Sequence, residues 1–108
     1  MSVLMNYAMF PTDKGDSVSE FVSKIIKMIS ESGYDYKLNA MGTIVETENI
    51  EQALEIVNKS YKILEPFSDR VYATISFDIQ TNKPTGRLEG KVKSIEEKFG
   101  AKRMELDS

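Results

Sequence analysis

Hydrophobic residues recur along the chain at two different spacings, and these spacings predict the order of its secondary-structure elements. Three stretches, beginning near residues 17, 49 and 86, carry apolar residues at helical spacing. Short apolar runs bounded by turn formers are typical of strands, and they occur at residues 3–10, 34–40, 41–47 and 70–81. The predicted order is therefore β-α-β-β-α-β, followed by one additional helix.

Sequence signals mark the ends of these helices. Ser17 and Glu20 have the spacing of a capping box, in which the Ser17 side chain caps the helix and Glu20 bonds back to the Ser17 amide. Gly33 is predicted to end the first helix. Asn49 is predicted to cap the second helix, and Pro66 to end it. The apolar stripe of the second helix is expected to comprise Ile50, Ala53, Leu54, Val57, Tyr61 and Leu64.

The element order indicates an α+β fold of the ferredoxin-like type, with a four-stranded antiparallel sheet, two helices on one face and an extra C-terminal helix. Residues 1–108 are expected to form a single domain. Residues 3–10 carry apolar side chains at both parities, which favours a central strand covered on both faces. Because the two helices cover only one face, we expect sheets of two or more subunits to associate through the other, giving a homo-oligomer. The last helix is a second candidate contact, through its stripe of Leu88, Val92, Ile95 and Phe99.

Composition and charge narrow the classes of function. The net charge of −3 gives no basic field that would attract nucleic acid, and no apolar stretch approaches the ~18 residues of a transmembrane helix. We therefore expect no nucleic acid and no membrane as partner. The chain has no Cys and no His, which excludes catalytic triads and the commonest zinc ligands and is consistent with the cytoplasm. Because the pattern contains no acid–base or nucleophile–base pair either, we expect no catalytic residue, no metal and no cofactor.

One face of the last predicted strand suggests a small-molecule site. If Ile75 and Phe77 point to the helices, alternate side chains point away from them. Asn6 and Thr43, on adjoining central strands, are expected to join this row. Hydroxyls and amides beside aromatic rings suit a flat heterocycle with ring nitrogens and an amino group. The alternative interpretation is a strand whose outer face is simply polar. The outward row consists of Tyr72, Thr74, Ser76 and Asp78.

Glu46, near the end of a central strand, is a further candidate. Its carboxylate can accept hydrogen bonds from an aminopyrimidine or balance a cationic ligand, and a solvated residue at a strand end is the alternative. Thr43 and Glu46 differ in parity and are therefore expected on opposite faces of the sheet. A ligand that touches both must reach round a strand edge or lie between two subunits.

Several segments in order resemble one protein family. They are residues 8–11 (AMFP), 17–20 (SVSE), 36–46 (YKLNAMGTIVE), 70–75 (RVYATI) and 90–98 (GKVKSIEEK), and the Met-Gly-Thr sequence followed by two β-branched residues and Glu is the most specific. With these segments the chain resembles the small thiamine-binding protein family, related to the YkoF-like ferredoxin-fold proteins.

The resemblance implies a cytoplasmic ferredoxin-like subunit that assembles into dimers and tetramers. It further implies binding of thiamine or its hydroxymethylpyrimidine moiety without catalysis, as a carrier, store or sensor. The matching segments point to Asn39, Thr43 and Glu46 as ligand-binding residues, and the polar strand face adds Asn6 and Ser76. Two other classes stay open: a regulatory protein-interaction module built on the last helix, and a small isomerase or monooxygenase-type enzyme.

Overall fold

The computed structural model describes residues 1–88, so the predicted last helix lies almost wholly outside the described residues. The predicted order β-α-β-β-α-β is confirmed within them. In chain order the elements are β1 (Ser2–Pro11), the short 3₁₀ helix η1 (Gly15–Ser17), α1 (Val18–Glu31), β2 (Tyr36–Asn39), β3 (Gly42–Thr47), α2 (Ile50–Leu64) and β4 (Val71–Gln80).

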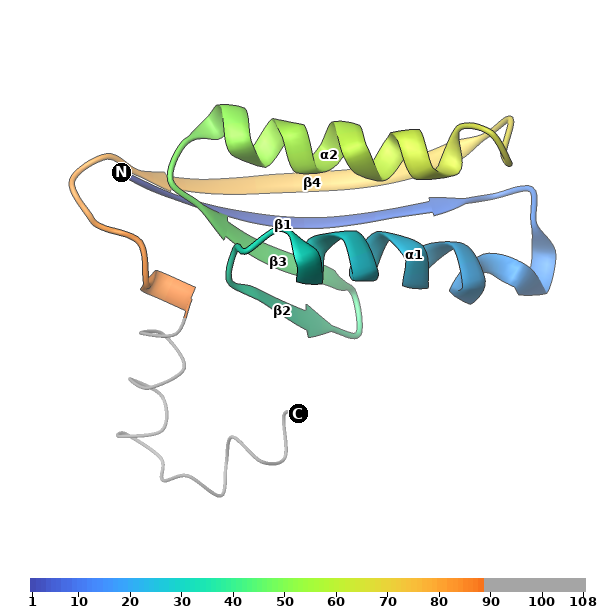
Figure 1. The fold of residues 1–108 in the computed structure, drawn as a ribbon, viewed down its shortest axis with the longest axis horizontal. Helices are drawn as coiled ribbons and strands as arrows, with labels where there is room; N and C mark the ends of the chain where they lie inside the picture. Colours follow the sequence, from blue (N-terminus) through green and yellow to red (C-terminus); the bar gives the residue numbers. More distant parts are fainter. Residues whose placement is uncertain (89–108) are drawn as a thin grey trace, which may run out of the picture.

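The four strands form one antiparallel sheet in the order β2-β3-β1-β4. β1 is therefore central, as its apolar residues at both parities predicted. α1 and α2 lie side by side on one face of this sheet, which makes a two-layer α+β fold (Figure 1). Both helices pack against β1, and α2 also packs against β3, whereas the edge strand β4 is less covered.

The hydrophobic core lies between the sheet and the two helices. Residues directly opposite each other in an antiparallel pair point to the same face, so the register identifies the helix-facing side chains. On β1 these are Val3, Met5, Tyr7 and Met9, none more than 7% exposed. Each large apolar side chain buried in this way contributes roughly 1.5–3 kcal/mol. The helices supply Ile25, Ile29, Ala53, Ile56 and Leu64 to the same cluster.

The sequence predicted the N-terminal cap of α2 correctly but not that of α1. Asn49 caps α2 as predicted, and its side chain accepts the backbone N–H of Gln52 at 2.9 Å. The capping box at Ser17 was a wrong prediction, because the Ser17 side chain makes no capping hydrogen bond. Ser17 instead ends η1, and its φ of −88° and ψ of 7° are not the extended geometry that an N-cap residue needs. Gly33, with φ of +87°, follows α1 as predicted.

The apolar stripe predicted for α2 is only partly buried. Ala53 and Leu64 are in the core, but Leu54 is 50% exposed and Tyr61 is 40% exposed. The buried face of α2 instead includes Ser60, which a hydrophobic pattern does not select. The stripe is therefore rotated, and one apolar flank of α2 remains at the surface.

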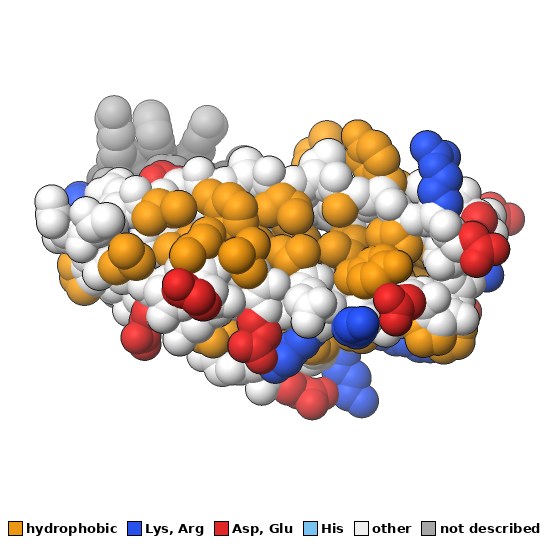
Figure 2. Space-filling view, turned by 90° about the horizontal axis from the view of Figure 1, so that it is seen from above, with side chains coloured by type: hydrophobic (Ala, Val, Ile, Leu, Met, Phe, Trp, Pro, Cys, Tyr) orange, Lys and Arg blue, Asp and Glu red, His pale blue; other side chains and the backbone are white. Residues whose placement is uncertain are grey.

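Exposed apolar side chains gather beside β4 more than on the face that the helices leave open. On that open face, Leu4 is only 7% exposed and Ile44 is half-buried. On β4, by contrast, Ile75, Phe77 and Ile79 are 40–47% exposed although the register turns them to the helix side. Figure 2 shows hydrophobic side chains as a broad band along the long axis of the face seen from above.

Candidate functional site

A cavity of about 340 Å³ opens between α1, the end of β1 and the hairpin of β2 and β3. Its lining is mostly apolar, which together with its size is typical of small-molecule sites of about 300–1,000 Å³. The hairpin residues at the cavity include both Asn39 and Thr43, two of the predicted ligand-binding residues. The lining residues are Tyr7, Ala8, Met9, Phe10, Val22, Ile25, Ile26 and, from the hairpin, residues 38–43.

The turn of the hairpin shapes one wall of this cavity. The Asn39 side-chain oxygen accepts the backbone N–H of Met41 at 2.8 Å, which closes the turn by an Asx-type hydrogen bond. Gly42 then passes so close to β1 that a Cβ placed on it would lie 2.6 Å from the carbonyl oxygen of Tyr7. Only glycine fits there without moving backbone, so the Met-Gly-Thr sequence allows this close approach of β3 to β1.

Thr43 lines the cavity and lies opposite Tyr7 on β1 and Leu38 on β2. Its side chain is 7% exposed and faces the helices. The prediction that Thr43 joins Asn6 on the face away from the helices was therefore wrong. In the β1–β3 register Asn6 lies opposite Ile44, so it is Ile44 and not Thr43 that shares its face. The prediction that Thr43 and Glu46 face opposite sides is confirmed.

Tyr7 is held between the cavity and α2. Its hydroxyl lies 2.8 Å from the Ser60 hydroxyl, which itself donates to the carbonyl oxygen of Ile56 at 2.7 Å. Tyr7 therefore acts as the donor in the first bond. Burial raises the pKa of the Tyr7 hydroxyl, and the hydrogen bond with Ser60 only partly offsets this. The phenol consequently fixes the position of the ring and stays neutral.

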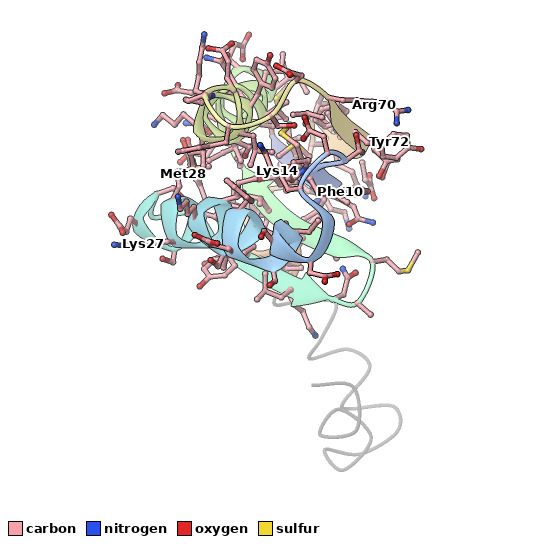
Figure 3. All side chains as sticks on the ribbon, turned by 90° about the vertical axis from the view of Figure 1, so that its right-hand side faces the viewer. Phe10, Lys14, Lys27, Met28, Arg70 and Tyr72 are labelled. Atoms are coloured by element: carbon pink, nitrogen blue, oxygen red, sulfur yellow. The ribbon has the colours of Figure 1, made fainter. Side chains whose placement is uncertain are left out.

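Aromatic rings also lie at the far end of β1. Figure 3 shows Phe10 and Tyr72 close together on the neighbouring strands β1 and β4. Their ring centroids are 5.7 Å apart and their planes are tilted by 44°. This tilted contact stabilises the strand ends by about 0.5–1.5 kcal/mol and holds Phe10, a cavity residue, in place.

Glu46 lies outside this cavity, at 3% exposure on the open side of β3. Its carboxylate accepts the Ser2 hydroxyl and the backbone N–H groups of Gly86, Arg87 and Leu88, the latter three at 3.0–3.3 Å. Burial alone would raise the pKa of Glu46, but the hydrogen bonds from Ser2 and the three amides outweigh it and hold the pKa below its ordinary value. In this structure Glu46 therefore anchors the segment that follows β4.

Arg87 completes this anchor. Its guanidinium donates to the Ser2 hydroxyl at 2.9 Å, to the Ser2 carbonyl at 2.9 Å and to the Asp78 carbonyl at 2.8 Å. It also forms an ion pair with the Asp78 carboxylate at 3.3 Å. The sequence suggested Arg87 only as part of a surface turn or a weak anion site with Lys83, and it gave no sign of Ser2. No local pattern shows that the two ends of the described chain meet at Glu46.

Asn6 and Ser76 are neighbours on the open face, as their predicted row required. They are directly opposite each other in the β1–β4 register, and the Ser76 hydroxyl donates weakly to the Asn6 carbonyl at 3.4 Å. Both border a shallow hollow of about 200 Å³ with Leu4, Ile44 and Asp78. The five predicted ligand-binding residues thus fall into three places: Asn39 with Thr43, Asn6 with Ser76, and Glu46 by itself.

The described residues place two further limits on the chemistry. Within residues 1–88, no three His, Cys, Asp or Glu side chains come together in a group that could hold a metal ion. No helix in the same range has both the length and the apolar composition needed to cross a bilayer.

Comparison with known proteins identifies the family. A model of the family described as thiamine-binding protein matches residues 5–96, which include the whole cavity lining. This chain belongs to the thiamine-binding protein family. The resemblance given by the Met-Gly-Thr segment and its neighbours is therefore confirmed.

Three proteins illustrate the likeness of this chain to others in sequence or in fold. A UPF0045 protein of Methanothermobacter thermautotrophicus is 31% identical over 77% of this chain and 84% of its own length. A hypothetical protein of Methanocaldococcus jannaschii, of known crystal structure, is 28% identical, with a TM-score of 0.73 over 87% of this chain and 95% of that one. A Thermotoga maritima protein, named as a candidate thiamine biosynthesis or salvage protein, has a TM-score of 0.75 at 24% identity over 88% and 99%. The last likeness shows the fold alone.

Proposed function

We propose that this protein is a cytoplasmic, oligomeric, non-catalytic binding protein for thiamine or its hydroxymethylpyrimidine moiety, acting as a carrier, store or sensor. The observation that carries the proposal is the apolar cavity between α1 and the β2–β3 hairpin, which has Asn39 and Thr43 in its lining. Membership of the thiamine-binding protein family supports the choice of ligand. The name of the Thermotoga maritima protein refers to thiamine biosynthesis or salvage, which is in keeping with a thiamine-related ligand.

The lining of the cavity suits a flat, neutral pyrimidine. Ile25 and Ile26 from α1 and Leu38 from β2 provide apolar walls for the ring faces. The buried Thr43 hydroxyl can accept from an exocyclic amino group and donate to a ring nitrogen. At Asn39 the side-chain oxygen is used by the turn, which leaves the NH₂ group as a donor at the rim. Two polar groups among apolar walls fix the orientation of a ring in such sites.

The same lining predicts how thiamine would be oriented. Among the described residues no charged side chain lines the cavity, and burying an unpaired cation is costly. The thiazolium ring should therefore stay at the open mouth while the pyrimidine enters. Asn6, Ser76 and Glu46 lie on the other side of the sheet, so they reach the same ligand only if a second subunit brings them there.

Isothermal titration with thiamine and with hydroxymethylpyrimidine tests this proposal. Thr43→Val removes the hydroxyl at nearly constant volume and should weaken binding about tenfold or more, equal to ~1.4 kcal/mol. Thr74→Val is the matched control on the open face of β4 and should bind like the wild type. Absence of heat with either ligand at protein concentrations well above ~10 μM contradicts the proposal. Loss of binding in Thr74→Val with retention in Thr43→Val would move the site to the open face.

A further inference from the structure

A second hollow, of about 370 Å³, lies on the outer side of the helical layer between α1 and α2. Its size is within the range of about 300–1,000 Å³ that is typical of small-molecule sites. All of its lining comes from α1, from the cap residue Ser32 and from α2, so the hollow opens away from the sheet. Figure 3 shows Met28 in the space between the two helices and Lys27 on the outer side of α1. The lining residues are Lys24, Lys27, Met28, Glu31, Ser32 and Lys59.

This hollow is separate from the cavity beside the hairpin. α1 lines both, but it turns Val22, Ile25 and Ile26 to the cavity and a different set of residues to the hollow. At 3.6 residues per turn the two sets lie on roughly opposite faces of the helix. An occupant of the hollow therefore does not compete with a ligand in the cavity, and the inference below does not depend on the proposed function.

Lysine side chains dominate the charge of the hollow. It has three lysines and one glutamate in its lining, although the chain as a whole has a net charge of −3. Lys24 and Lys27 come from α1 and Lys59 from α2, so the ammonium groups approach from both walls. Within residues 1–88 neither Lys24 nor Lys27 forms an ion pair. Their positive charges are therefore available to an anion that enters the hollow.

The Lys24 ammonium is held by two aromatic rings. Its Nζ atom lies 4.7 Å from the centroid of the Phe67 ring and 5.5 Å from that of Phe21, and the two centroids are 5.4 Å apart. A cation–π contact orients the ammonium group and leaves its charge in place, whereas a carboxylate partner would neutralise it. Lys24 consequently has less side-chain freedom to lose on binding an anion than an unrestrained surface lysine has.

The acidic groups near the hollow indicate where in it an anion would lie. Lys59 is paired with Glu55 at 3.2 Å, but the two side chains are more than half exposed, so the pair is weak and an anion can compete for Lys59. Glu31 is the last residue of α1, roughly 10 Å along the helix from Lys24. The negative end of the helix dipole adds to the charge of Glu31 there. The favourable position is therefore among the three lysines, away from Glu31.

A phosphate group matches this arrangement of cations. Its terminal oxygens can accept from several ammonium groups that approach from different directions, and lysine binds phosphate as a point charge. Met28 is half-buried against the core and offers an apolar floor to the organic part of a ligand. We propose that the hollow between α1 and α2 binds a small organic phosphate, with its phosphate group among Lys24, Lys27 and Lys59 and its organic part against Met28.

Titration calorimetry of the full chain with phenyl phosphate at low salt tests the proposal. Saturable binding with a Kd on the order of 1 mM or tighter is expected, and inorganic phosphate should bind more weakly because it lacks the organic part. Lys59→Gln should weaken binding of phenyl phosphate about fivefold or more. Lys62→Gln is the matched control, because it also removes one charge and one exposed ion pair from α2 but does not line the hollow. The control should bind like the wild type, and circular dichroism should show that both variants are folded.

Removal of the one carboxylate in the lining should have the opposite effect. Glu31→Gln should strengthen binding of phenyl phosphate about twofold or more, whereas Glu65→Gln, outside the hollow, should leave it unchanged. Absence of saturable binding up to ~10 mM phenyl phosphate overturns the proposal, and so do equal losses in Lys59→Gln and Lys62→Gln. Phosphatidylcholine vesicles with and without a phosphatidylinositol phosphate test for a lipid headgroup. Binding to the phosphorylated vesicles without binding of phenyl phosphate would overturn the assignment of a free small molecule.

Discussion

Glu46 and Arg87 share the hydroxyl group of Ser2 as a common hydrogen-bonding partner. That hydroxyl donates to the Glu46 carboxylate and accepts from the Arg87 guanidinium at 2.9 Å, while Glu46 also accepts the Arg87 backbone N–H at 3.1 Å. The arrangement joins β3 to a segment forty-one residues later and to the first residue of β1. Glu46 therefore has a structural task in the isolated subunit, whatever further role a second subunit gives it.

Replacing Glu46 by Gln should loosen this junction. An amide offers one acceptor oxygen in place of two and turns its NH₂ group toward backbone N–H donors that it cannot satisfy. The expected loss in the free energy of unfolding is about 1–3 kcal/mol, the usual effect of an unsatisfied buried polar group. Urea unfolding at pH 7 measures it. Glu48→Gln, at an exposed position two residues away, is the control and should stay within ~0.5 kcal/mol of wild type. Equal stability of the two variants would contradict this role of Glu46.

The lowered pKa of Glu46 predicts a particular dependence of stability on pH. Since the folded state lowers the pKa below its ordinary value of 4.5, the unfolded chain binds the proton more readily. The contribution of Glu46 is therefore complete above pH 4.5 and is lost as the pH falls through the folded pKa. The stability difference between wild type and Glu46→Gln should shrink between pH 7 and about pH 3.5. Taking the difference cancels other acidic groups such as Asp13, whose pKa is also lowered by its hydrogen bonds to Ser68 and the Asp69 amide. A difference that grows on acidification would refute the prediction.

Gly42→Ala should disrupt the pairing of β3 with β1 beside the cavity. The added Cβ would lie 2.6 Å from the Tyr7 carbonyl oxygen, and its two nearest neighbours are backbone atoms of a central strand that cannot turn aside. Gly15→Ala is the control, because Gly15 has φ of +54° and open space where the added methyl group would lie. The control should lose only the ~1–2 kcal/mol of a left-handed residue, and Gly42→Ala clearly more. Thermal or urea unfolding of both variants decides the order, and the reverse order would show that β1 and β3 can separate at little cost.

Asn39→Asp separates the turn from the proposed ligand contact. Aspartate keeps an oxygen for the Met41 N–H, which lies 2.8 Å from the Asn39 oxygen, so the hairpin should form normally. It replaces the NH₂ donor by a second oxygen, which should weaken binding of hydroxymethylpyrimidine about tenfold or more, equal to ~1.4 kcal/mol. Titration calorimetry measures the affinity, and urea unfolding confirms that the fold is retained. Unchanged affinity in a stable variant would show that the Asn39 amide does not contact the ligand.

Local patterns predicted the elements because their signals lie within a few residues of one another. The cap of α2 involves only Asn49 and Gln52, three residues apart. The apolar side chains on both faces of β1 indicated a central strand without reference to any other segment. Parity alone showed that Thr43 and Glu46 face opposite sides of the sheet. The failure at Ser17 was also local in origin, since Ser17 ends a turn of 3₁₀ helix and so lacks the extended geometry that the capping box required.

Other features depend on where distant segments meet, and the tertiary structure decided them. The sequence by itself determined the α+β order, the family and the polar residues worth testing. Only the tertiary arrangement of α1 beside the hairpin created a cavity at Asn39 and Thr43. Only the return of the chain to β1 gave Glu46 its partners Ser2 and Arg87. The exposed row on β4 likewise follows from helices that pack mainly over β1 and β3. Periodicity specifies which side chains share a face, but burial depends on which other segment covers that face.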